Sequence, residues 1–526
     1  MKLVFVTGGV VSSLGKGVTA ASLGRLLKAR GYSVSMQKCD TYYNLEPALI
    51  SPIQNGEAFI TEDGSATDLD LGHYERFIDE NLLGEASITT GKVHRSLMER
   101  ELRGEYRGST IQVVPHVTDE IKRRILTSAE KSGADIAIIE IGGVVGDMES
   151  SPYLEAIRQL RLELGAHNTC FVHVTLIPYI SVAGEMKTKP TQHSVKDLRS
   201  IGIQPDVIVC RTEKMLSNEA KDKIALFCNV KTGHVINNMD VDTPYEAPLC
   251  LEKEHFASIV LKELAAEDRT PDLTAWKDLV DRIYHPVQTV RIALVGKYVS
   301  VPSAYLSVRE ALLHAGFSAR ATVQIDWIDS TKLESGDPAQ YLKDHDGIII
   351  PGGYGQHGAE GIMRACTYAR ENKLPCLMIC YGMQLAAVEA VRNLLHQPHA
   401  NSTEVVESCD PQVVRLNPKE IEWTNHPGHM GAKTVRLQAG RLQSIYSCDE
   451  ISERHANRYE INADLLPALE KKGLHFTASR FPGGEADGFE LEGHPFYIGV
   501  MFHPEFKSRP NRPHPLFEAF LQAAMA

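Results

Sequence analysis

Continuous apolar runs recur along the chain and predict buried strands. The runs lie at residues 3–6, 135–141, 170–175, 205–210, 290–296, 347–350 and 376–380. Uninterrupted apolar runs are typical of parallel strands that helices cover on both faces. Helix-forming stretches separate the runs, so the pattern predicts an α/β fold with two domains, each a mostly parallel sheet flanked by helices.

A polar, proline-punctuated stretch divides the chain between Glu267 and Pro286. Prolines at its two ends interrupt regular structure, and the residues between them favour a linker helix. We therefore expect a first domain at residues 1–265, a linker at 266–289 and a second domain at 290–526.

Composition narrows the function classes. The chain has 526 residues, of which 43% are hydrophobic, and a formal charge of −12. This apolar content can fill sizeable cores and argues against a disordered chain, while the acidic balance argues against a general nucleic-acid binder. The sequence contains no apolar run long enough to cross a membrane. Met1 leads straight into a strand pattern and a glycine-rich loop, so we expect no signal segment.

Ten cysteines are scattered along the sequence. None of them forms the Cys-x-x-Cys spacing of a zinc site or a redox dithiol, and so sparse a pattern does not indicate a disulfide framework. We expect a reduced, cytoplasmic protein.

The first strand leads into a glycine-rich loop at residues 7–19, followed by a helix pattern. This order points backbone N–H groups at phosphate, and Lys16 adds a positive charge. The match to a phosphate-binding P-loop is imperfect, because five residues separate Gly9 from Gly15 and Gly17 stands where a magnesium-binding Ser or Thr is expected. An ordinary glycine-rich turn is the alternative.

Magnesium at such a site needs oxygen ligands from elsewhere. Glu140 ends the apolar run 135–139, and Asp70 lies in an acidic segment at 67–75. An acid at the carboxyl end of a parallel strand faces the nucleotide in open α/β sheets. A third feature, Lys187 to Ser194, places two lysines around a threonine and can clamp a second phosphate group. For Glu140, for Asp70 and for the lysine segment, the alternative interpretation is an ordinary solvated side chain with no ligand.

Cys380 ends an apolar strand and precedes a helix-like run. A tight strand-to-helix turn exposes a thiol, and the helix N-terminus lowers its pKa, so this pattern indicates a nucleophile. Gly382 relieves crowding at the turn. Cys376, in the strand itself, is interpreted as a buried core cysteine.

A thiolate nucleophile needs a base, an orienting acid and an oxyanion hole. His503 follows a second apolar strand pattern, and Glu505 stands two residues later. Residues 351–355, Pro-Gly-Gly-Tyr-Gly, come directly after the strand 347–350 and offer backbone N–H groups. The order Cys, His, Glu permits a catalytic triad but does not establish one.

Together these motifs resemble the CTP synthase family. The second half is similar to class I glutamine amidotransferases through residues 351–355, 380–384 and 503–505. The first half is similar to the ATP-dependent amidoligase domain of that family through Gly8–Gly17, Ser51–Glu57, Thr61–Gly64, Thr67–Phe77 and Lys187–Val195.

The resemblance implies a glutamine-dependent ligase of pyrimidine biosynthesis. ATP would phosphorylate O4 of UTP, glutamine would be hydrolysed at Cys380 through a thioester, and ammonia would pass through an internal tunnel to yield CTP. It also implies Mg²⁺, allosteric activation by GTP, inhibition by CTP, a homotetramer with nucleotide sites at subunit interfaces, and neither a nucleic-acid polymer nor a membrane as partner.

The resemblance also assigns site residues by position. ATP would be held by Ser13, Leu14, Gly15, Lys16, Gly17, Val18, Lys38 and Asp70, and magnesium by Asp70 and Glu140. UTP and CTP would be held by Ser12, Asp147, Met148, Glu149, Lys187, Thr188, Lys189, Pro190, Thr191, Gln192 and Lys223. Glutamine would be held by Gly353, Tyr381, Gly382, Met383, Gln384, Glu404 and Arg458, beside the catalytic Cys380, His503 and Glu505.

Some positions depart from the family pattern. Asn55 and Ala58 replace a usual His and Val beside the expected tunnel entrance, and residues 429–436 are a looser version of a lid segment that is associated with GTP. Further departures lie at Thr41, at residues 46–50 and at Ala456-Asn457.

Three other functions compete with this interpretation. A related corrinoid side-chain amidase shares the two-domain plan, but Ser51–Glu57 and Lys187–His193 speak against it. A ParA-like P-loop ATPase has no use for Cys380, His503 and Glu505. A filament subunit without turnover has no use for either set of motifs, although polymerisation can accompany activity.

Overall fold

The structure is a computed structural model that describes residues 1–12, 14–47, 50–182, 184–416 and 429–526, with Asn55 described for its backbone alone. The chain forms two compact units. The first comprises Met1–Leu49 and Asp70–Val280, and the second comprises Ile50–Leu69 and Asp281–Ala526. We call residues 50–69 the docking segment, because they precede Asp70 in the first half of the chain but pack with the second unit.

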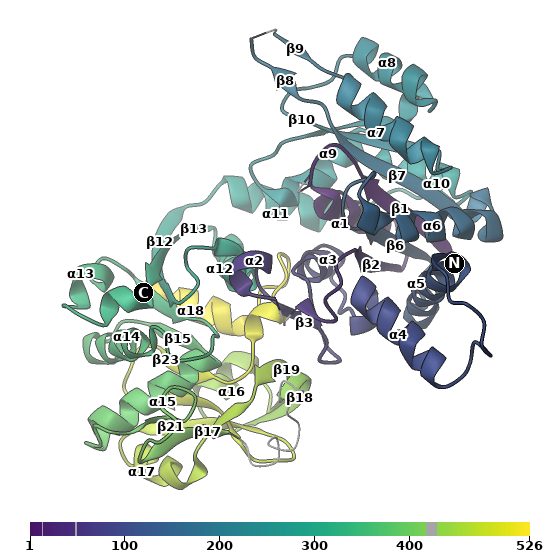
Figure 1. Ribbon diagram of the computed structural model, residues 1–526. Helices are drawn as coiled ribbons and strands as arrows, with labels where there is room; N and C mark the ends of the chain where they lie inside the picture. Colours follow the sequence, from purple (N-terminus) through teal and green to yellow (C-terminus); the bar gives the residue numbers. More distant parts are fainter. Residues whose placement is uncertain (13, 48–49, 183, 417–428) are drawn as a thin grey trace. The chain divides into compact units, whose positions relative to one another are not determined.

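The first unit is built on a parallel sheet (Figure 1). Within the described residues the sheet has seven strands, and all its pairs are parallel. In spatial order they are β11 (Val235–Met239), β10 (Val207–Thr212), β7 (Thr169–Leu176), β1 (Lys2–Gly8), β6 (Ile136–Ile141), β2 (Val34–Asp40) and β5 (Ser87–Thr89). The apolar runs at 3–6, 135–141, 170–175 and 205–210 therefore form strands, as predicted.

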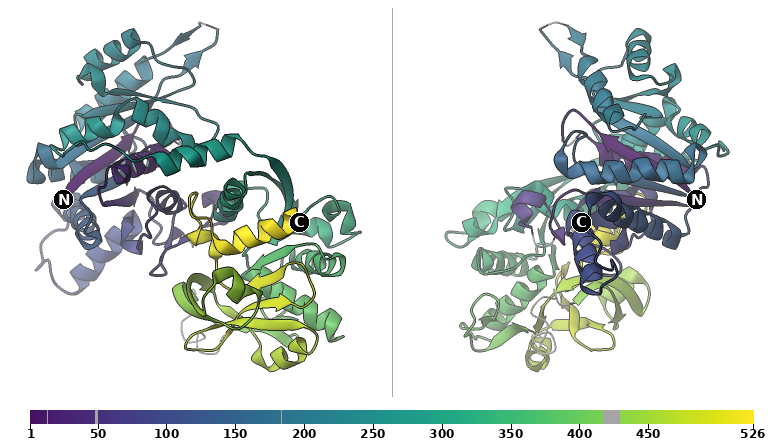
Figure 2. Two further views of the ribbon diagram at one scale, coloured as in Figure 1. Left: turned by 180° about the vertical axis from the view of Figure 1, so that it is seen from behind. Right: turned by 45° about the vertical axis from the view of Figure 1, so that its right-hand side comes forward.

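Helices cover both faces of this sheet (Figure 2). Ile125 and Leu160, from α5 and α6, pack against Phe5 on one face. On the other face α1 approaches so closely that a Cβ on Gly24 would lie 3.3 Å from Met36 of β2. The helices are α1 (Lys16–Ala29), α3 (Asp70–Ile78), α4 (Thr90–Leu102), α5 (Thr118–Ser132), α6 (Ser151–Leu164), α7 (Lys189–Ser200), α8 (Asn218–Cys228), α9 (Ala247–Lys253), α10 (Phe256–Glu263) and α11 (Thr274–Tyr284), and a hairpin of β8 (Tyr179–Ile180) and β9 (Glu185–Met186) follows β7.

The second unit contains a mixed sheet that has nine strands within the described residues. Five strands are parallel, and an antiparallel extension that the sequence did not predict continues the sheet. Their order is β13 (Ala321–Asp329), β12 (Gln288–Gly296), β14 (Gly347–Ile350), β15 (Cys376–Ile379), β23 (Tyr497–Val500), β22 (Ala486–Leu491), β21 (Leu474–Arg480), β18 (His429–Leu437) and β19 (Glu450–Asn457). Residues 429–436, compared above with a lid, thus form most of β18.

Helices flank this sheet as well. Leu312 and Phe520, from α12 and α18, pack against Leu294, whereas Ile362 and Val388, from α14 and α15, belong to the core on the opposite face. The helices are α12 (Leu306–Ser318), α13 (Ala339–Leu342), α14 (Ala359–Asn372), α15 (Tyr381–Leu394), α16 (Arg441–Tyr446), α17 (Leu466–Glu470) and α18 (Pro515–Met525), and a small sheet joins β16 (Asn401–Ser402), β17 (Gln412–Leu416) and β20 (Tyr459–Ile461). Both units confirm the predicted α/β class.

The docking segment contains α2 (Pro52–Asn55), β3 (Phe59–Ile60) and β4 (Ala66–Thr67). The sequence grouped these residues with the first domain, whereas they pack with the second unit. The division between the units at Val280 and Asp281 falls within α11, inside the expected linker 266–289. No helix in the described part of the chain is long and apolar enough to cross a membrane.

Candidate active sites

Cys380 sits at the turn between β15 and α15. Its backbone has φ 52° and ψ −104°, a strained conformation that turns the chain sharply at the first residue before the helix. A Cβ at position 382 would lie 2.6 Å from the carbonyl oxygen of Ile350, so only glycine allows the helix to start this close to β14. Cys380 stands at the helix N-terminus, as the elbow pattern predicts, but its side chain is buried, with 5% exposed, rather than open to solvent. Cys376 lies fully buried in the strand.

His503 lies beside Cys380 because their strands are neighbours. β15 and β23 pair in parallel with Ile379 opposite Val500, and both residues follow the carboxyl ends of these strands. The Nδ1 atom of His503 lies 2.7 Å from the Oε1 atom of Glu505. The turn at Pro504 thus lets the carboxylate orient the imidazole.

The electrostatics of this pair favour an imidazolium. Burial opposes a charge on His503, but the Glu505 carboxylate and the adjoining Cys380 thiol outweigh it and raise the pKa of the imidazole well above its usual value. A cationic imidazole next to a sulfur stabilises the thiolate. The three side chains can therefore act as a nucleophile, a base and an orienting acid.

The loop after β14 and the first residue of α15 supply candidate oxyanion donors. A Cβ on Gly352 would lie 2.8 Å from Cε1 of His503, so the loop passes directly over the imidazole. The Gly353 N–H has no acceptor in the described part of the chain. The N–H of Tyr381 opens α15, where a helix provides no internal acceptor. These two amides can bind an oxygen that becomes negatively charged.

A cluster of opposite charges adjoins this loop. Glu404 accepts a hydrogen bond from the Gly355 N–H at 3.0 Å, and burial raises the pKa of its carboxyl despite the nearby Lys297 and Arg458. Gln384 donates from Nε2 to the Tyr459 carbonyl at 3.1 Å. A carboxylate beside an exposed arginine suits the two charged ends of a free amino acid. The side chain of Met383, in contrast, lies in the hydrophobic core.

In the first unit, the glycine-rich loop leads into α1 as predicted. Gly15 adopts φ 87° at the helix N-cap, and a Cβ on Gly8 would lie 2.5 Å from Lys16 Cδ, so the lysine folds back across the loop. Lys16 Nζ donates to the Gly143 carbonyl at 2.6 Å, and burial lowers its pKa. Free helix N–H groups and a buried lysine together fit a phosphate.

Lys38, Asp70 and Glu140 converge beside this loop. Lys38 and Glu140 stand opposite each other on β2 and β6, and their Nζ and Oε1 atoms are 3.0 Å apart. Asp70, at the start of α3, forms an ion pair with the same Nζ. Burial opposes the charge of Lys38, but Asp70 and Glu140 raise its pKa well above the usual value.

The same two carboxylates fit magnesium. A Cβ on Gly17 would lie 3.1 Å from Asp70 Oδ1 and 3.4 Å from Glu140 Oε2, so glycine leaves room where a P-loop carries Ser or Thr. Within the described residues no three or more His, Cys, Asp or Glu side chains are arranged to hold a metal. Mg²⁺ does not need such a cage, because it takes one or two carboxylates together with phosphate oxygens and water.

The residues expected to hold a pyrimidine nucleotide come from the segments that follow β1, β6, β7 and β10 in the chain. Thr191, in the first turn of α7, donates to Thr175 Oγ1 at 3.0 Å, and Gln192 Nε2 donates to Thr188 Oγ1 at 3.1 Å. Lys187 pairs with Glu185 on the hairpin. The other members are Lys189 and Pro190 in α7, Lys223 in α8, and Ser12, Asp147, Met148 and Glu149 in loops or a short turn.

The structure does not join all these residues directly. Asp147 accepts a hydrogen bond from the Val144 N–H at 2.8 Å, and Met148 is exposed. No hydrogen bond or ion pair between described residues links 147–149 to 187–192. Ser13 lies outside the described residues, as does the side chain of Asn55.

Comparisons with known proteins cover the whole chain. The family model for the CTP synthase N-terminus matches residues 2–266, and that for class-I glutamine amidotransferase matches residues 300–523. CTP synthase of Ruminiclostridium cellulolyticum is 51% identical over 527 residues, which cover 100% of this chain and 98% of the relative. The chain belongs to the CTP synthase family. CTP synthase of Symbiobacterium thermophilum is also 51% identical, over 532 residues with the same coverage.

A solved structure, the Trypanosoma brucei CTPS glutaminase domain with bound acivicin, covers 45% of this CTP synthase family chain and 94% of its own length, with 33% identity and a TM-score of 0.43.

Lys297 is a residue that the sequence analysis missed in this CTP synthase family member. Its Nζ donates to the Tyr354 carbonyl at 2.6 Å, to the Gly355 carbonyl, and to the Tyr381 hydroxyl at 3.2 Å. Burial lowers its pKa to about 8. Lys297 thus holds the loop that offers one of the two candidate oxyanion donors, the Gly353 N–H. Its position directly after the apolar run 290–296 was a usable signal, because side chains there reach the same sheet edge as Cys380.

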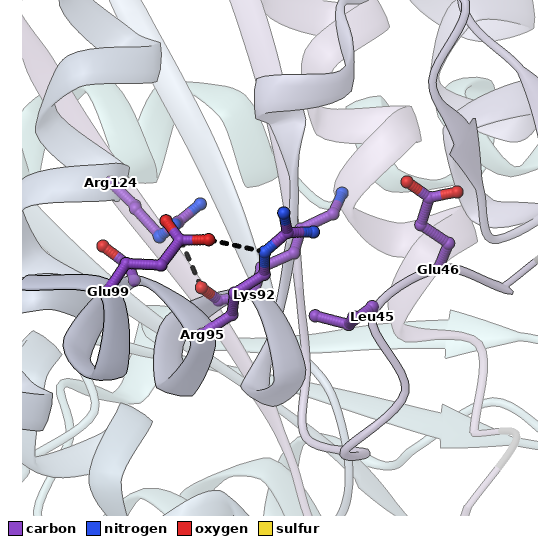
Figure 3. A pocket seen from close by; sticks show the side chains of 7 residues that line it. Leu45, Glu46, Lys92, Arg95, Glu99 and Arg124 are labelled. Carbon is purple, nitrogen blue, oxygen red and sulfur yellow. Dashed lines mark hydrogen bonds and ion pairs between the residues drawn. The ribbon is translucent and has the colours of Figure 1, made fainter. Parts of the chain in front are cut away.

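One cavity is lined by residues of the first unit alone. It has a volume of about 270 Å³ and is lined by Leu45, Glu46, Lys92, Arg95, Ser96, Glu99 and Arg124 (Figure 3). Its cations already have partners, since Arg95 pairs with Glu99 at 2.7 Å and Arg124 with Glu120 at 2.8 Å. None of the lining residues is among the predicted site residues of this CTP synthase family chain.

Proposed function

We propose that this chain catalyses the ATP-dependent amination of UTP to CTP with nitrogen from L-glutamine. The proposal rests on one observation: the chain contains both a Cys–His–Glu cluster and a separate Lys–Asp–Glu phosphate site. The first is suited to releasing ammonia from an amide, and the second to activating an oxygen by phosphorylation. The full-length relatives of the chain are named CTP synthase.

Glutamine hydrolysis follows from the geometry of the second unit. The Cys380 thiolate attacks the side-chain amide carbon, and the Gly353 and Tyr381 amides receive the developing oxyanion. His503 gives its proton to the leaving nitrogen, so ammonia departs and a thioester remains. Water then attacks the thioester while His503 takes its proton, and glutamate is released. Glu404 and Arg458 hold the amino and carboxylate groups of the substrate.

The activating step belongs to the first unit. Lys16, Lys38 and the N–H groups of α1 hold the ATP phosphates in position for attack by O4 of the uracil. Asp70 and Glu140 would hold Mg²⁺, which neutralises charge on the phosphate oxygens when bound. The 4-phosphoryl group makes a good leaving group, so ammonia can replace it at C4 and give CTP and phosphate.

The resemblance supplies the remaining parts of the proposal. Ammonia passes through an internal tunnel, because in neutral water it would be protonated and lose its nucleophilic lone pair. GTP activates the enzyme, and CTP inhibits it at the pocket that includes Asp147–Glu149 and Lys187–Gln192. The active form is a homotetramer. No observation favours the corrinoid amidase or ParA-like alternatives.

Cys380→Ala tests the proposal directly. With ATP, UTP and Mg²⁺, the variant should form no CTP from glutamine, because the thiolate is missing, but should form CTP from ammonium salts at a rate near that of the wild type. CTP is measured by chromatography. If wild-type protein hydrolyses glutamine but aminates UTP with neither nitrogen source, the proposed function is wrong.

A further inference from the structure

The docking segment is firmly attached to the second unit at Glu57. Its backbone N–H donates to the Ser303 carbonyl at 2.9 Å. Its carboxylate accepts hydrogen bonds from the backbone N–H of Ser307, at 2.8 Å, and from the Ser307 hydroxyl. Ser307 is in the first turn of α12, where a carboxylate also interacts favourably with the helix dipole. The docking segment therefore has a defined position against the glutaminase fold.

Arg454 of β19 makes a second and deeper attachment. Its side chain is fully buried, Nη1 donates to the Ile60 carbonyl at 2.9 Å, and Nε donates to Glu62 Oε2 at 2.9 Å. Its guanidinium also lies over the Phe59 ring, 5.4 Å from the centroid. A buried guanidinium depends strongly on its partners, because an uncompensated charge is costly inside a protein. These partners belong to the docking segment.

The same arginine contacts His503 through its backbone. The His503 N–H donates to the Arg454 carbonyl at 2.7 Å. An aromatic contact runs in parallel: Phe506 stacks on the His503 ring with centroids 5.2 Å apart, and the edge of Phe59 meets Phe506 at 5.1 Å. Both routes link the docking segment to the imidazole over very few contacts.

The other end of the docking segment leads to the phosphate site. Leu69 is its last residue, and the next residue, Asp70, forms the ion pair with Lys38 beside Glu140. A ligand bound at Asp70 therefore contacts the residue that directly follows a segment in contact with the surroundings of His503.

We propose that Arg454 is a positioning residue through which the docking segment sets the orientation of His503 toward Cys380. The inference rests on the proposed function and adds a regulatory step to it. Nucleotide bound at Asp70 shifts the docking segment, and Arg454 with Phe59 passes the shift to the imidazole. Because such coupling is reciprocal, glutamine bound at Cys380 in turn favours nucleotide binding.

Glu62→Gln tests this role, because it removes the charge that partners Arg454 at a side chain that is 27% exposed. Glutamine hydrolysis is measured with and without ATP plus UTP. We expect kcat with nucleotides to fall about tenfold, the usual size of allosteric coupling, while KM for glutamine changes by less than about twofold. Ammonia-dependent CTP formation should stay near the wild-type rate.

Glu485→Gln is the matched control. Glu485 is 20% exposed and pairs at 3.6 Å with Arg480, another buried arginine of the same sheet, but it lies outside the docking segment. This variant should keep both the wild-type kcat and its stimulation by nucleotides. An equal loss in the two variants would show a general effect on the sheet and overturn the proposal.

Phe59→Leu provides a second variant on the aromatic route and replaces Glu62→Gln if that protein fails to fold. Nucleotide stimulation should fall here too, because the contact with Phe506 is lost. Undiminished stimulation in a folded variant, or a loss confined to KM, would overturn the coupling role. These assays measure glutamine hydrolysis and not CTP formation. A failure of the coupling role can therefore be told apart from a failure of the proposed function, in which the wild-type protein never aminates UTP.

Discussion

At the scale of single residues, the proposed chemistry of the second unit depends most on His503. Its Nδ1 faces Glu505. Burial lowers the pKa of the imidazole, but the interactions with Glu505 and Cys380 raise it by more. Because the folded-state pKa lies above the usual value of roughly 6.5, the imidazolium persists to higher pH than it would in an unperturbed histidine. The associated stability is complete below that value and is lost as pH rises through the folded-state pKa.

Glu505→Gln should separate the role of this carboxylate from that of the thiol. Without the negative charge, the pKa of His503 falls, so the alkaline limb of the pH–rate profile for glutamine hydrolysis moves to lower pH. We expect kcat to drop on the order of 10²–10⁴-fold, which is the usual contribution of an oriented acid–base group to the rate. Ammonia-dependent CTP formation should be unaffected. An alkaline limb that stays at the wild-type pH would contradict this assignment.

At the scale of elements, each candidate site lies at the carboxyl ends of the parallel strands of its own sheet. The sequence predicted Cys380 and Glu140 at strand ends, and Lys16 in the glycine-rich loop between a strand and a helix, because each of these is a local pattern. It did not predict the place of the docking segment, because that place depends on distant partners. Arg454 and Glu62 are 392 residues apart, and no local periodicity reports such a contact.

The assignment of glutamine-site residues shows the same limit. Tyr381 and Glu404 came from the family resemblance, and Lys297, which the resemblance did not bring forward, organises the loop near both of them. The hydrophobic pattern indicates where a strand ends, but it does not specify which of the polar side chains beyond the end fold back toward the loop. That choice is made by packing and burial.

Gly382→Ala tests the geometry of the strand-to-helix turn. The added Cβ would lie 2.6 Å from the Ile350 carbonyl oxygen, which belongs to strand backbone and has little freedom to move. We expect a loss of about 1–3 kcal/mol in stability and a fall of about 10²-fold in glutamine hydrolysis, because the thiol is displaced. Thermal melting and glutaminase assays measure both.

Gly233→Ala is the control for this substitution. A Cβ there meets no atom within 4 Å, and the glycine does not have a positive φ. Melting temperature and both activities should stay at wild-type values. A Gly382→Ala protein that behaves like this control would show that α15 can move away from β14 without consequence for the thiol.

At the scale of the whole molecule, the proposed function puts two reaction centres in one chain, and it requires that ammonia from one reaches the other efficiently. Ammonia released to bulk water is diluted and mostly protonated near neutral pH, whereas delivery within one chain maintains a high effective concentration. Docking segment residues such as Glu57 and Glu62 come from the first half of the sequence, yet they belong to the glutaminase unit. The two functions are therefore interleaved in sequence rather than joined end to end.

Mixing two inactive variants tests delivery within the chain. Asp70→Asn should hydrolyse glutamine but form no CTP from either nitrogen source, because it loses the carboxylate that adjoins Lys38 and the proposed magnesium position. Cys380→Ala has the opposite defect. When the two proteins are mixed in equal amounts, Asp70→Asn releases ammonium from glutamine into the solution. The mixture should form CTP no faster than Cys380→Ala alone does when it is given that concentration of free ammonium. A mixture that recovers a large part of the wild-type rate would mean that ammonia passes between chains.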